Sequence, residues 1–176
     1  MGAHAMTAGN KEDGLRRWRV AGGIIDLDGR VLLVENLRRH GGTDWSPPGG
    51  VVEPGEDSVD GLTREVIEET GLVVTSWSGP LYSVETVAED MGWHLSVQVF
   101  KAVSWTGHVT IGNDPDGIVV SANYVDLEEC AAKMADNGRW VREPLIAWMQ
   151  ERWHDHRVFR YHLGGTDRKN LKVTRK

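Results

Sequence analysis

The segment that decides the fold is GGVVEPGEDSVDGLTREVIEETGL, which runs from Gly49 to Leu72. It holds seven acidic residues and a single base, Arg64, so its formal charge is −6. The whole chain of 176 residues also has a formal charge of −6. Removing the segment leaves 19 acids and 19 bases, so one short stretch carries the entire net charge of the protein.

Residues 57–70 of this segment have the periodicity of an α-helix. Their apolar residues recur at spacings of three and four, which places them along one face. Gly71 follows at the position where a helix commonly ends in glycine. The expected apolar stripe consists of Val59, Leu62, Val66 and Ile67.

Three glutamates lie beside that stripe. Glu65, Glu68 and Glu69 fall within about one quadrant of the helix because they are spaced i, i+3, i+4. Glu69 is expected nearest the core. Like charges at this spacing repel one another, more so when they are partly desolvated, and no Lys or Arg occurs between Arg64 and Lys101. Either a distant base or a hard divalent cation such as Mg²⁺ or Mn²⁺ could neutralise the cluster; the alternative is a solvated acidic face.

The composition is that of one globular domain. Hydrophobic residues make up 40% of the chain and charged residues 26%, which is ordinary for a folded protein. No apolar run approaches the roughly 20 residues of a membrane-spanning helix, and no signal segment opens the chain. Cys130 is the only cysteine, so no intrachain disulfide forms. These features predict a cytoplasmic protein without a membrane partner, and the net acidity argues against a nucleic-acid partner.

Three regions are expected along the chain. Residues 1–6, MGAHAM, have the character of a cloning remnant. Residues 7–157 are expected to form a single domain. Residues 158–176 contain six bases and one acid, and they are expected to be a basic C-terminal extension.

The secondary-structure patterns predict a layered domain. Residues 18–36 have the composition of two strands joined by a turn at Asp26–Gly29. Residues 38–50 contain four glycines and two prolines, which predict a loop. Further strands are expected at residues 72–77, 80–88, 93–105 and 117–127, and further helices at residues 127–136 and 143–153. This order indicates an α+β fold or an α/β/α sandwich with a central mixed β-sheet flanked by helices.

The acidic segment resembles the signature of the Nudix hydrolases. The spacing is a glycine, five residues, a glutamate, seven residues and then REVIEETGL. The matching positions are Gly50, Glu56, Arg64, Glu65, Val66, Glu68, Glu69, Gly71 and Leu72. Trp45 and the SPPGG that follows it resemble the W-x-L-P-G-G motif that precedes the signature in many members, with Pro47 in the place of Leu. We call residues 50–72 the Nudix box.

This resemblance implies a Nudix fold and hydrolysis that depends on Mg²⁺ or Mn²⁺. By position, Glu65, Glu68 and Glu69 would hold the metal together with the backbone carbonyl of Gly49. The resemblance also implies that Glu56 and Arg64 form a supporting pair that orients the loop and the helix.

The sequence offers more than one candidate for the general base. Some members of the family use a glutamate of the box and others an acid on a later loop. Glu68 or Glu69 is the first expectation for this chain, and Asp116 in GNDPDG is a second. A tight turn is the simpler interpretation of NDPDG.

Residues outside the box are expected to determine the substrate. Arg38 and Arg39 could bind phosphate; the alternative is that they are an exposed pair on a loop. Trp45 could stack on a base; the alternative is that it is a packed core residue. Residues 87–90, VAED, lack the proline associated with ADP-ribose hydrolases and the tyrosine associated with dinucleoside polyphosphate hydrolases.

The sequence therefore predicts a divalent-metal-dependent pyrophosphohydrolase. Its substrate would be a small nucleotide, either a (deoxy)nucleoside triphosphate or another nucleoside diphosphate linked to a further group. A sensor domain that binds a nucleotide without cleaving it, an ADP-ribose or nucleotide-sugar hydrolase, and a structural domain whose acidic helix docks a basic partner are the alternatives. The resemblance also makes a homodimer an expectation.

Overall fold

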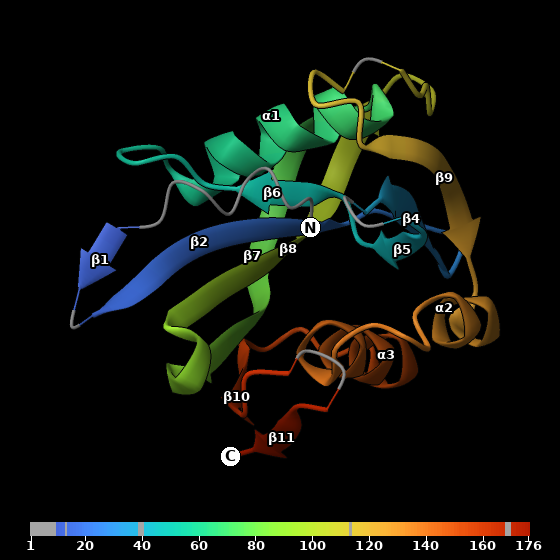
Figure 1. The fold of residues 1–176 in the computed structure, drawn as a ribbon. Coiled ribbons are helices and arrows are strands. Elements are labelled where there is room, and N and C mark those ends of the chain that lie inside the picture. The colour runs from blue at the N-terminus through green and yellow to red at the C-terminus, as the bar shows by residue number, and fades with distance from the viewer. Residues whose placement is uncertain (1–9, 13, 39–40, 113, 168–169) are drawn as a thin grey trace.

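The computed structural model describes residues 10–12, 14–38, 41–112, 114–167 and 170–176 (Figure 1). Residues 1–6 and Arg39 therefore lie outside the described residues. The elements in chain order are β1 (Asn10–Glu12), β2 (Leu15–Ile24), β3 (Asp26–Leu27), β4 (Arg30–Leu37), β5 (Thr43–Ser46), β6 (Gly49–Val51), α1 (Ser58–Thr70), β7 (Val73–Ala88), the 3-10 turn η2 (Glu89–Met91), β8 (Trp93–Thr106), β9 (Val119–Val125), α2 (Leu127–Lys133), α3 (Arg139–Glu151), β10 (Arg157–Gly164) and β11 (Lys172–Arg175).

The strands form a mixed sheet with a smaller sheet beside it. In the larger sheet the spatial order is β1-β2-β8-β7-β10-β11, and β6 pairs with β2. The β2–β8 and β7–β10 pairs are parallel, whereas β7 and β8 are antiparallel. In the smaller sheet β4 pairs with β3, β5 and β9. Helix α1 covers one face, and α2 and α3 lie on the other (Figure 1), so the predicted α/β/α sandwich is confirmed.

A separate hydrophobic core fills each side of the larger sheet. Leu62 and Val66 of α1 are fully buried in one core, and Leu145 of α3 is fully buried in the other. Ile67 was expected in the apolar stripe but is 39% exposed. It lies five residues after Leu62, which is about 140° around the helix, and so points away from the sheet.

Several predicted elements differ from the structure: the helix expected at 143–153 begins at Arg139, and the two strands expected at 18–36 lie in different sheets. The expected loop at residues 38–50 contains β5 and the start of β6, which bond to β4 and β2 respectively. Glycine and proline disfavour regular local structure, but here distant strands supply the hydrogen-bond partners. The two strands expected at 72–77 and 80–88 form a single strand, β7, whose register shifts between Ser78 and Tyr82.

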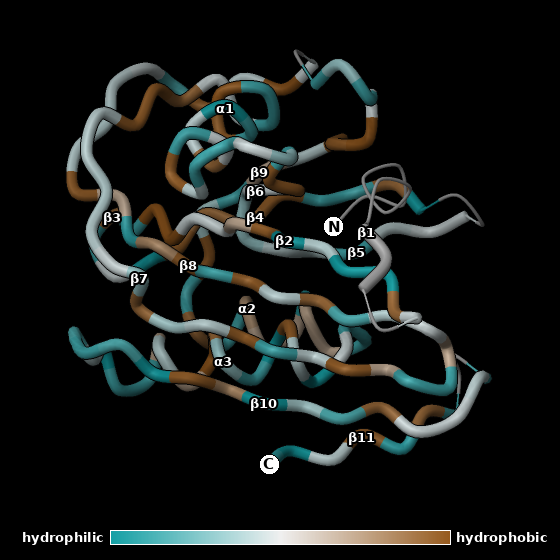
Figure 2. Tube along the Cα trace, turned by 90° about the vertical axis from the view of Figure 1, so that its left-hand side faces the viewer, coloured by the Kyte–Doolittle hydropathy of each residue, from teal (hydrophilic) through white to brown (hydrophobic). Residues whose placement is uncertain are grey.

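The sheet also continues past the predicted boundary at residue 157. Strand β10 pairs with β7 and places Phe159, Tyr161 and Leu163 in the core. Figure 2 shows this strand beside β7, and exposed or partly exposed residues alternate with buried ones from Val158 to Gly164. The alternation has the period of a half-buried strand, and the count of basic residues hid it. The folded unit therefore extends at least to Gly164, with β11 paired beyond it.

No helix among the described residues is long and apolar enough to cross a membrane.

Candidate active site

The close approach of β6 to α1 assembles the candidate active site. Gly49 lies opposite Gly22 in the β2–β6 pair, and its N–H donates to a carboxylate oxygen of Glu69 at 2.8 Å. A Cβ atom at Gly49 would lie 2.2 Å from the carbonyl oxygen of Ala21. A Cβ atom at Gly50 would lie 2.4 Å from Cδ of Glu65. Glycine at Gly49 therefore allows β6 to lie close to the backbone of β2, and glycine at Gly50 leaves room for the carboxylate of Glu65.

Glu56 and Arg64 join the start of the Nudix box to the helix. Arg64 donates through Nε and Nη2 to the two oxygens of Glu56, at 3.2 and 3.3 Å. Glu56 also accepts the N–H of Glu53 at 2.9 Å. The hydrogen bond from Arg64 lowers the pKa of Glu56, and the same bond raises the pKa of Arg64. This two-point pairing fixes the loop that leads into α1.

Arg64 also contacts the acidic cluster itself. Its Nη1 donates to Glu65 at 2.7 Å and lies 3.5 Å from a carboxylate oxygen of Glu68. The base that partly neutralises the cluster is therefore on the same helix rather than distant in the sequence. The spacing of Arg64 and Glu68, i and i+4, is one at which helical side chains meet, whereas adjacent residues such as Arg64 and Glu65 normally diverge.

Burial and mutual repulsion disfavour the ionised forms of two of the glutamates. Burial raises the pKa of Glu69 to about 8, and the charge of Glu65 adds to the shift. Burial likewise raises the pKa of Glu65, against the opposing effect of Arg64. Such carboxyl groups bind either a proton or a cation more readily than exposed ones.

The donor set fits a hard divalent cation. Carboxylate oxygens of Glu65, Glu68 and Glu69 and the backbone of Gly49 gather at one end of α1, and these are the ligands that Mg²⁺ and Mn²⁺ prefer. Across the described ranges, however, no three acidic, His or Cys side chains already converge in the geometry of a metal site. Arg64 holds Glu65 and Glu68 through its Nη1, so metal binding would require these side chains to turn from it.

The stability of the metal-free protein is expected to fall as pH rises from about 4.5 to 8. Unfolded Glu69 ionises near its ordinary pKa of 4.5, whereas the folded carboxyl keeps its proton up to about 8. Loss of the proton therefore favours the unfolded state in this window, by at most about 1.4 kcal/mol per pH unit. Urea unfolding in EDTA at several pH values measures the slope. A Glu69→Gln variant should show a flatter slope, and an unchanged slope would contradict the assignment.

Among the described residues, the substrate-binding residues expected from the sequence each have a contact other than with the three glutamates. Arg38 is ion-paired with Asp44, and burial lowers its pKa. The ring of Trp45 is covered by Lys133, whose Nζ lies 3.7 Å from the ring centre. Asp116 is exposed in a turn, where its N–H donates to Asp114.

Asp114 is a neighbour of the cluster that the sequence did not single out. Its negative charge contributes to the raised pKa of both Glu65 and Glu69. One of its oxygens accepts the N–H groups of Ile118 and Val119 at 2.7 and 2.9 Å, which fixes its position. The motif NDPDG indicated an acid on this loop but not which of its two aspartates approaches the box.

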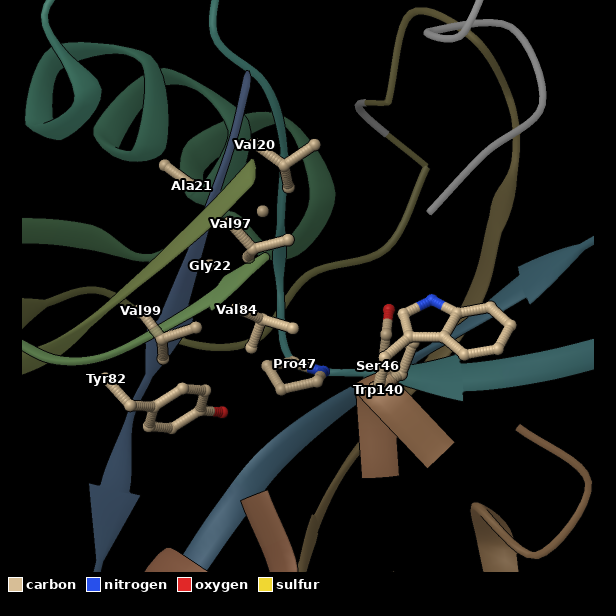
Figure 3. Close-up of a pocket in the computed structure, with 12 residues that line it drawn as sticks. Val20, Ala21, Gly22, Ser46, Pro47, Tyr82, Val84, Val97, Val99 and Trp140 are labelled. Atoms are coloured by element: carbon tan, nitrogen blue, oxygen red, sulfur yellow. The ribbon is translucent and has the colours of Figure 1, made fainter. Parts of the chain in front are cut away.

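An apolar pocket adjoins Gly49 on the sheet face opposite α1. Figure 3 shows Tyr82, Val84, Val97 and Val99 on its sheet side and Trp140, from the first turn of α3, on the other. The complete lining is Val20, Ala21, Gly22, Ser46, Pro47, Gly49, Tyr82, Val84, Val97, Val99, Trp140 and Val141. Trp140 was not predicted, because a tryptophan 70 residues after the box carries no local signal of its position.

Comparison with known proteins agrees with this geometry. The sequence profile of the NUDIX domain matches residues 15–149. The 8-oxo-dGTP diphosphatase of Proteus vulgaris is 31% identical over 98 residues, which cover 54% of this chain and 84% of that protein. The ADP-ribose pyrophosphatase of Methanocaldococcus jannaschii is 28% identical over 123 residues, 69% of each chain. The mouse protein named nucleoside diphosphate-linked moiety X motif 6 is 47% identical over 53 residues, only 17% of its length.

Solved structures share the fold. The solution structure of the E. coli ORF135 protein superimposes with a TM-score of 0.65 at 20% identity, covering 83% of this chain and all of that one. The MutT protein of Bacillus halodurans gives a TM-score of 0.62 at 22% identity, covering 90% and 97% of the two chains. The sandwich is thus the fold that these proteins share. The chain belongs to the Nudix family.

Proposed function

We propose that this protein is a divalent-metal-dependent pyrophosphohydrolase of small nucleotides. The observation that carries the proposal is the contact between the glycine pair of β6 and the carboxylates of Glu65 and Glu69 on α1. This arrangement gathers hard oxygen donors on a rigid helix beside a loop that a bulky anion can approach. Mg²⁺ or Mn²⁺, when bound, would screen the phosphate charge and lower the pKa of the attacking water.

The protein's own residues would have distinct roles. Glu65, Glu68 and Glu69, with the backbone carbonyl of Gly49, would hold the metal. Glu68 or Glu69 would accept the proton of the attacking water; Asp114 is held too firmly by backbone N–H groups to be our first choice. The pair of Arg64 with Glu56 would hold the loop so that the donors keep their positions.

The apolar pocket supports a nucleobase as the bound group. Valines on one side and the ring of Trp140 on the other provide flat apolar walls, and Ser46 offers a hydroxyl at the edge. The pocket borders Gly49, so a nucleotide seated there would direct its phosphates toward the box. Among the predicted substrates, this favours a (deoxy)nucleoside triphosphate, the class named for the Proteus vulgaris relative.

The test is a hydrolysis assay with purified protein and Mg²⁺ or Mn²⁺. The substrate panel contains the four deoxynucleoside triphosphates, 8-oxo-dGTP, ADP-ribose and a nucleoside diphosphate sugar. Metal-dependent release of pyrophosphate and a nucleoside monophosphate from a triphosphate would support the proposal. Preferred cleavage of ADP-ribose or the nucleotide sugar would favour that alternative, and tight binding without turnover would favour a sensor.

Trp140→Ala is expected to raise KM for the preferred nucleotide about tenfold, with a smaller change in kcat. The substitution removes one wall of the pocket but touches none of the carboxylates, and base stacking on an aromatic ring contributes about 1–3 kcal/mol. Steady-state kinetics measure the two constants separately. Trp105→Ala is the matched control, since Trp105 packs in the core on the α1 side; an equal rise in KM for both variants would argue against a base in this pocket.

A further inference from the structure

A second pocket lies on the α1 side of the sheet, at the point where α1 begins. It is open, polar and about 330 Å³ in volume. Its lining consists of Arg19, Val20, Ser58, Ser83, Glu85, Ser96 and Gln98. Ser58 is the first residue of α1, and Glu65 follows seven residues later, about 10 Å along the helix. The pocket is therefore separate from the carboxylates of the candidate active site.

The strand register sets the layout of this pocket. Arg19 of β2 lies opposite Ser96 of β8. Ser96 also lies opposite Glu85 of β7. On its other side, Glu85 lies opposite Arg160 of β10. These residues form one row across four neighbouring strands. With strands about 4.8 Å apart, the two arginines at its ends are separated by roughly 14 Å.

Two arginines stand at the ends of this row, and Glu85 lies between them. Within the described part of the chain, neither Arg19 nor Arg160 forms an ion pair, and the hydrogen bond of Arg19 goes to the hydroxyl of Ser58 at 3.1 Å. Glu85, the acid in the row, accepts from Ser96 at 2.6 Å and lies 2.7 Å from Nε2 of His94. Arg19 is therefore the positive charge that the pocket offers to an anion, and Glu85 is the acid at its other end.

The donors at the Arg19 end of the pocket suit a tetrahedral oxyanion. Arg19 has five N–H donors and uses one of its nitrogens, Nη2, for Ser58. Gln98 accepts from Ser58 through Oε1 at 2.9 Å, and its Nε2 donors take no part in that bond. The N-terminus of α1 lies at the same place, where the carboxylate of Asp57 already accepts the N–H of Val59.

We propose that this pocket binds the phosphate group of a small molecule, held beside Ser58 by the remaining N–H donors of Arg19 and by Nε2 of Gln98. The ligand is inorganic phosphate or a phosphate monoester, and the site is distinct from the hydrolytic site. Glu85 stands about two strand spacings from Arg19 and limits how far the anion enters. A neutral sugar would use the pocket differently, because its hydroxyl groups would donate to Glu85.

The test is ¹⁵N NMR titration of the intact protein in EDTA at low salt, without divalent cation, so that the acidic box repels the anion. The probes are inorganic phosphate, glycerol 3-phosphate and glycerol. Either phosphate probe is expected to bind with a millimolar Kd and shift the Gln98 side-chain amide and the Ser58 backbone amide. Glycerol is expected to produce no shift. Absence of shifts with both phosphates up to about 50 mM would overturn the proposal.

Two variants and a control are expected to change phosphate affinity in different directions. Arg19→Gln should weaken phosphate binding at least tenfold, whereas Glu85→Gln should tighten it about threefold by removing a like charge. Arg16→Gln, on the same strand but on the opposite face, should leave it unchanged. Weaker phosphate binding in Glu85→Gln, or equal losses in the two arginine variants, would overturn the proposal. Nucleotide hydrolysis should be unaffected by Arg19→Gln, so this test is independent of the proposed activity.

Discussion

Glu69→Gln is expected to lower kcat/KM for nucleotide hydrolysis by about 10³-fold. The amide oxygen of Gln can still accept the N–H of Gly49, so the contact between β6 and α1 should persist. The variant, however, cannot form the carboxylate that would bind the cation at the most deeply placed position of the cluster. Loss of a metal ligand or of a general base typically costs a factor of 10²–10⁴. Steady-state kinetics with Mg²⁺ measure the effect, and calorimetry with Mn²⁺ reports metal affinity directly.

A charge-matched control separates a local effect from a general one. Glu53→Gln removes the same charge from the same acidic segment, but the Glu53 side chain is exposed at the loop. Its hydrolysis rate and Mn²⁺ affinity should stay within about twofold of the wild type. If Glu69→Gln retained more than a tenth of the wild-type activity, or if both variants lost activity equally, the role assigned to Glu69 would be wrong.

The sequence was most informative where neighbouring residues in the chain are also neighbours in space. The position of α1, its end at Gly71 and the inward placement of Glu69 follow from a period of 3.6 residues. The family resemblance covered the same segment, because the functional positions of the box occupy one loop and one helix. A contiguous motif of this kind specifies both local conformation and chemistry.

Features that depend on distant segments could not be predicted in the same way. The register of β2 against β6 decides that Gly49 meets Ala21 and Glu69, and no local pattern encodes it. Trp140 reaches the apolar pocket only because α3 packs across the sheet. Strand β10 was not predicted, because residues 158–176 are rich in bases, although five of the six lie beyond the strand. Substrate preference depends on these non-local contacts, so the sequence left it open.

Gly49→Ala is expected to destabilise the protein by about 3–5 kcal/mol. The new Cβ would lie 2.2 Å from the carbonyl oxygen of Ala21 and 2.8 Å from Cα of Gly22, both rigid backbone atoms of a central strand. The φ angle of +140° is also one that residues with a side chain rarely adopt. Relief requires β6 to move away from β2, which breaks sheet hydrogen bonds in the core. Urea unfolding in EDTA measures the loss.

Gly55→Ala is the matched control, since it isolates the strain of positive φ from the steric clash. Gly55 lies in the same segment with φ of +85°, and a Cβ there would meet nothing within 4 Å. Its substitution should cost only about 1 kcal/mol. Equal losses in the two variants would show that the close approach of β6 to β2 is not what requires glycine.

Because Gly49 donates to Glu69, any Gly49→Ala protein that remains folded should also bind Mn²⁺ more weakly, whereas Gly55→Ala should not. This difference would tie the stability of the β2–β6 contact to the chemistry of the box.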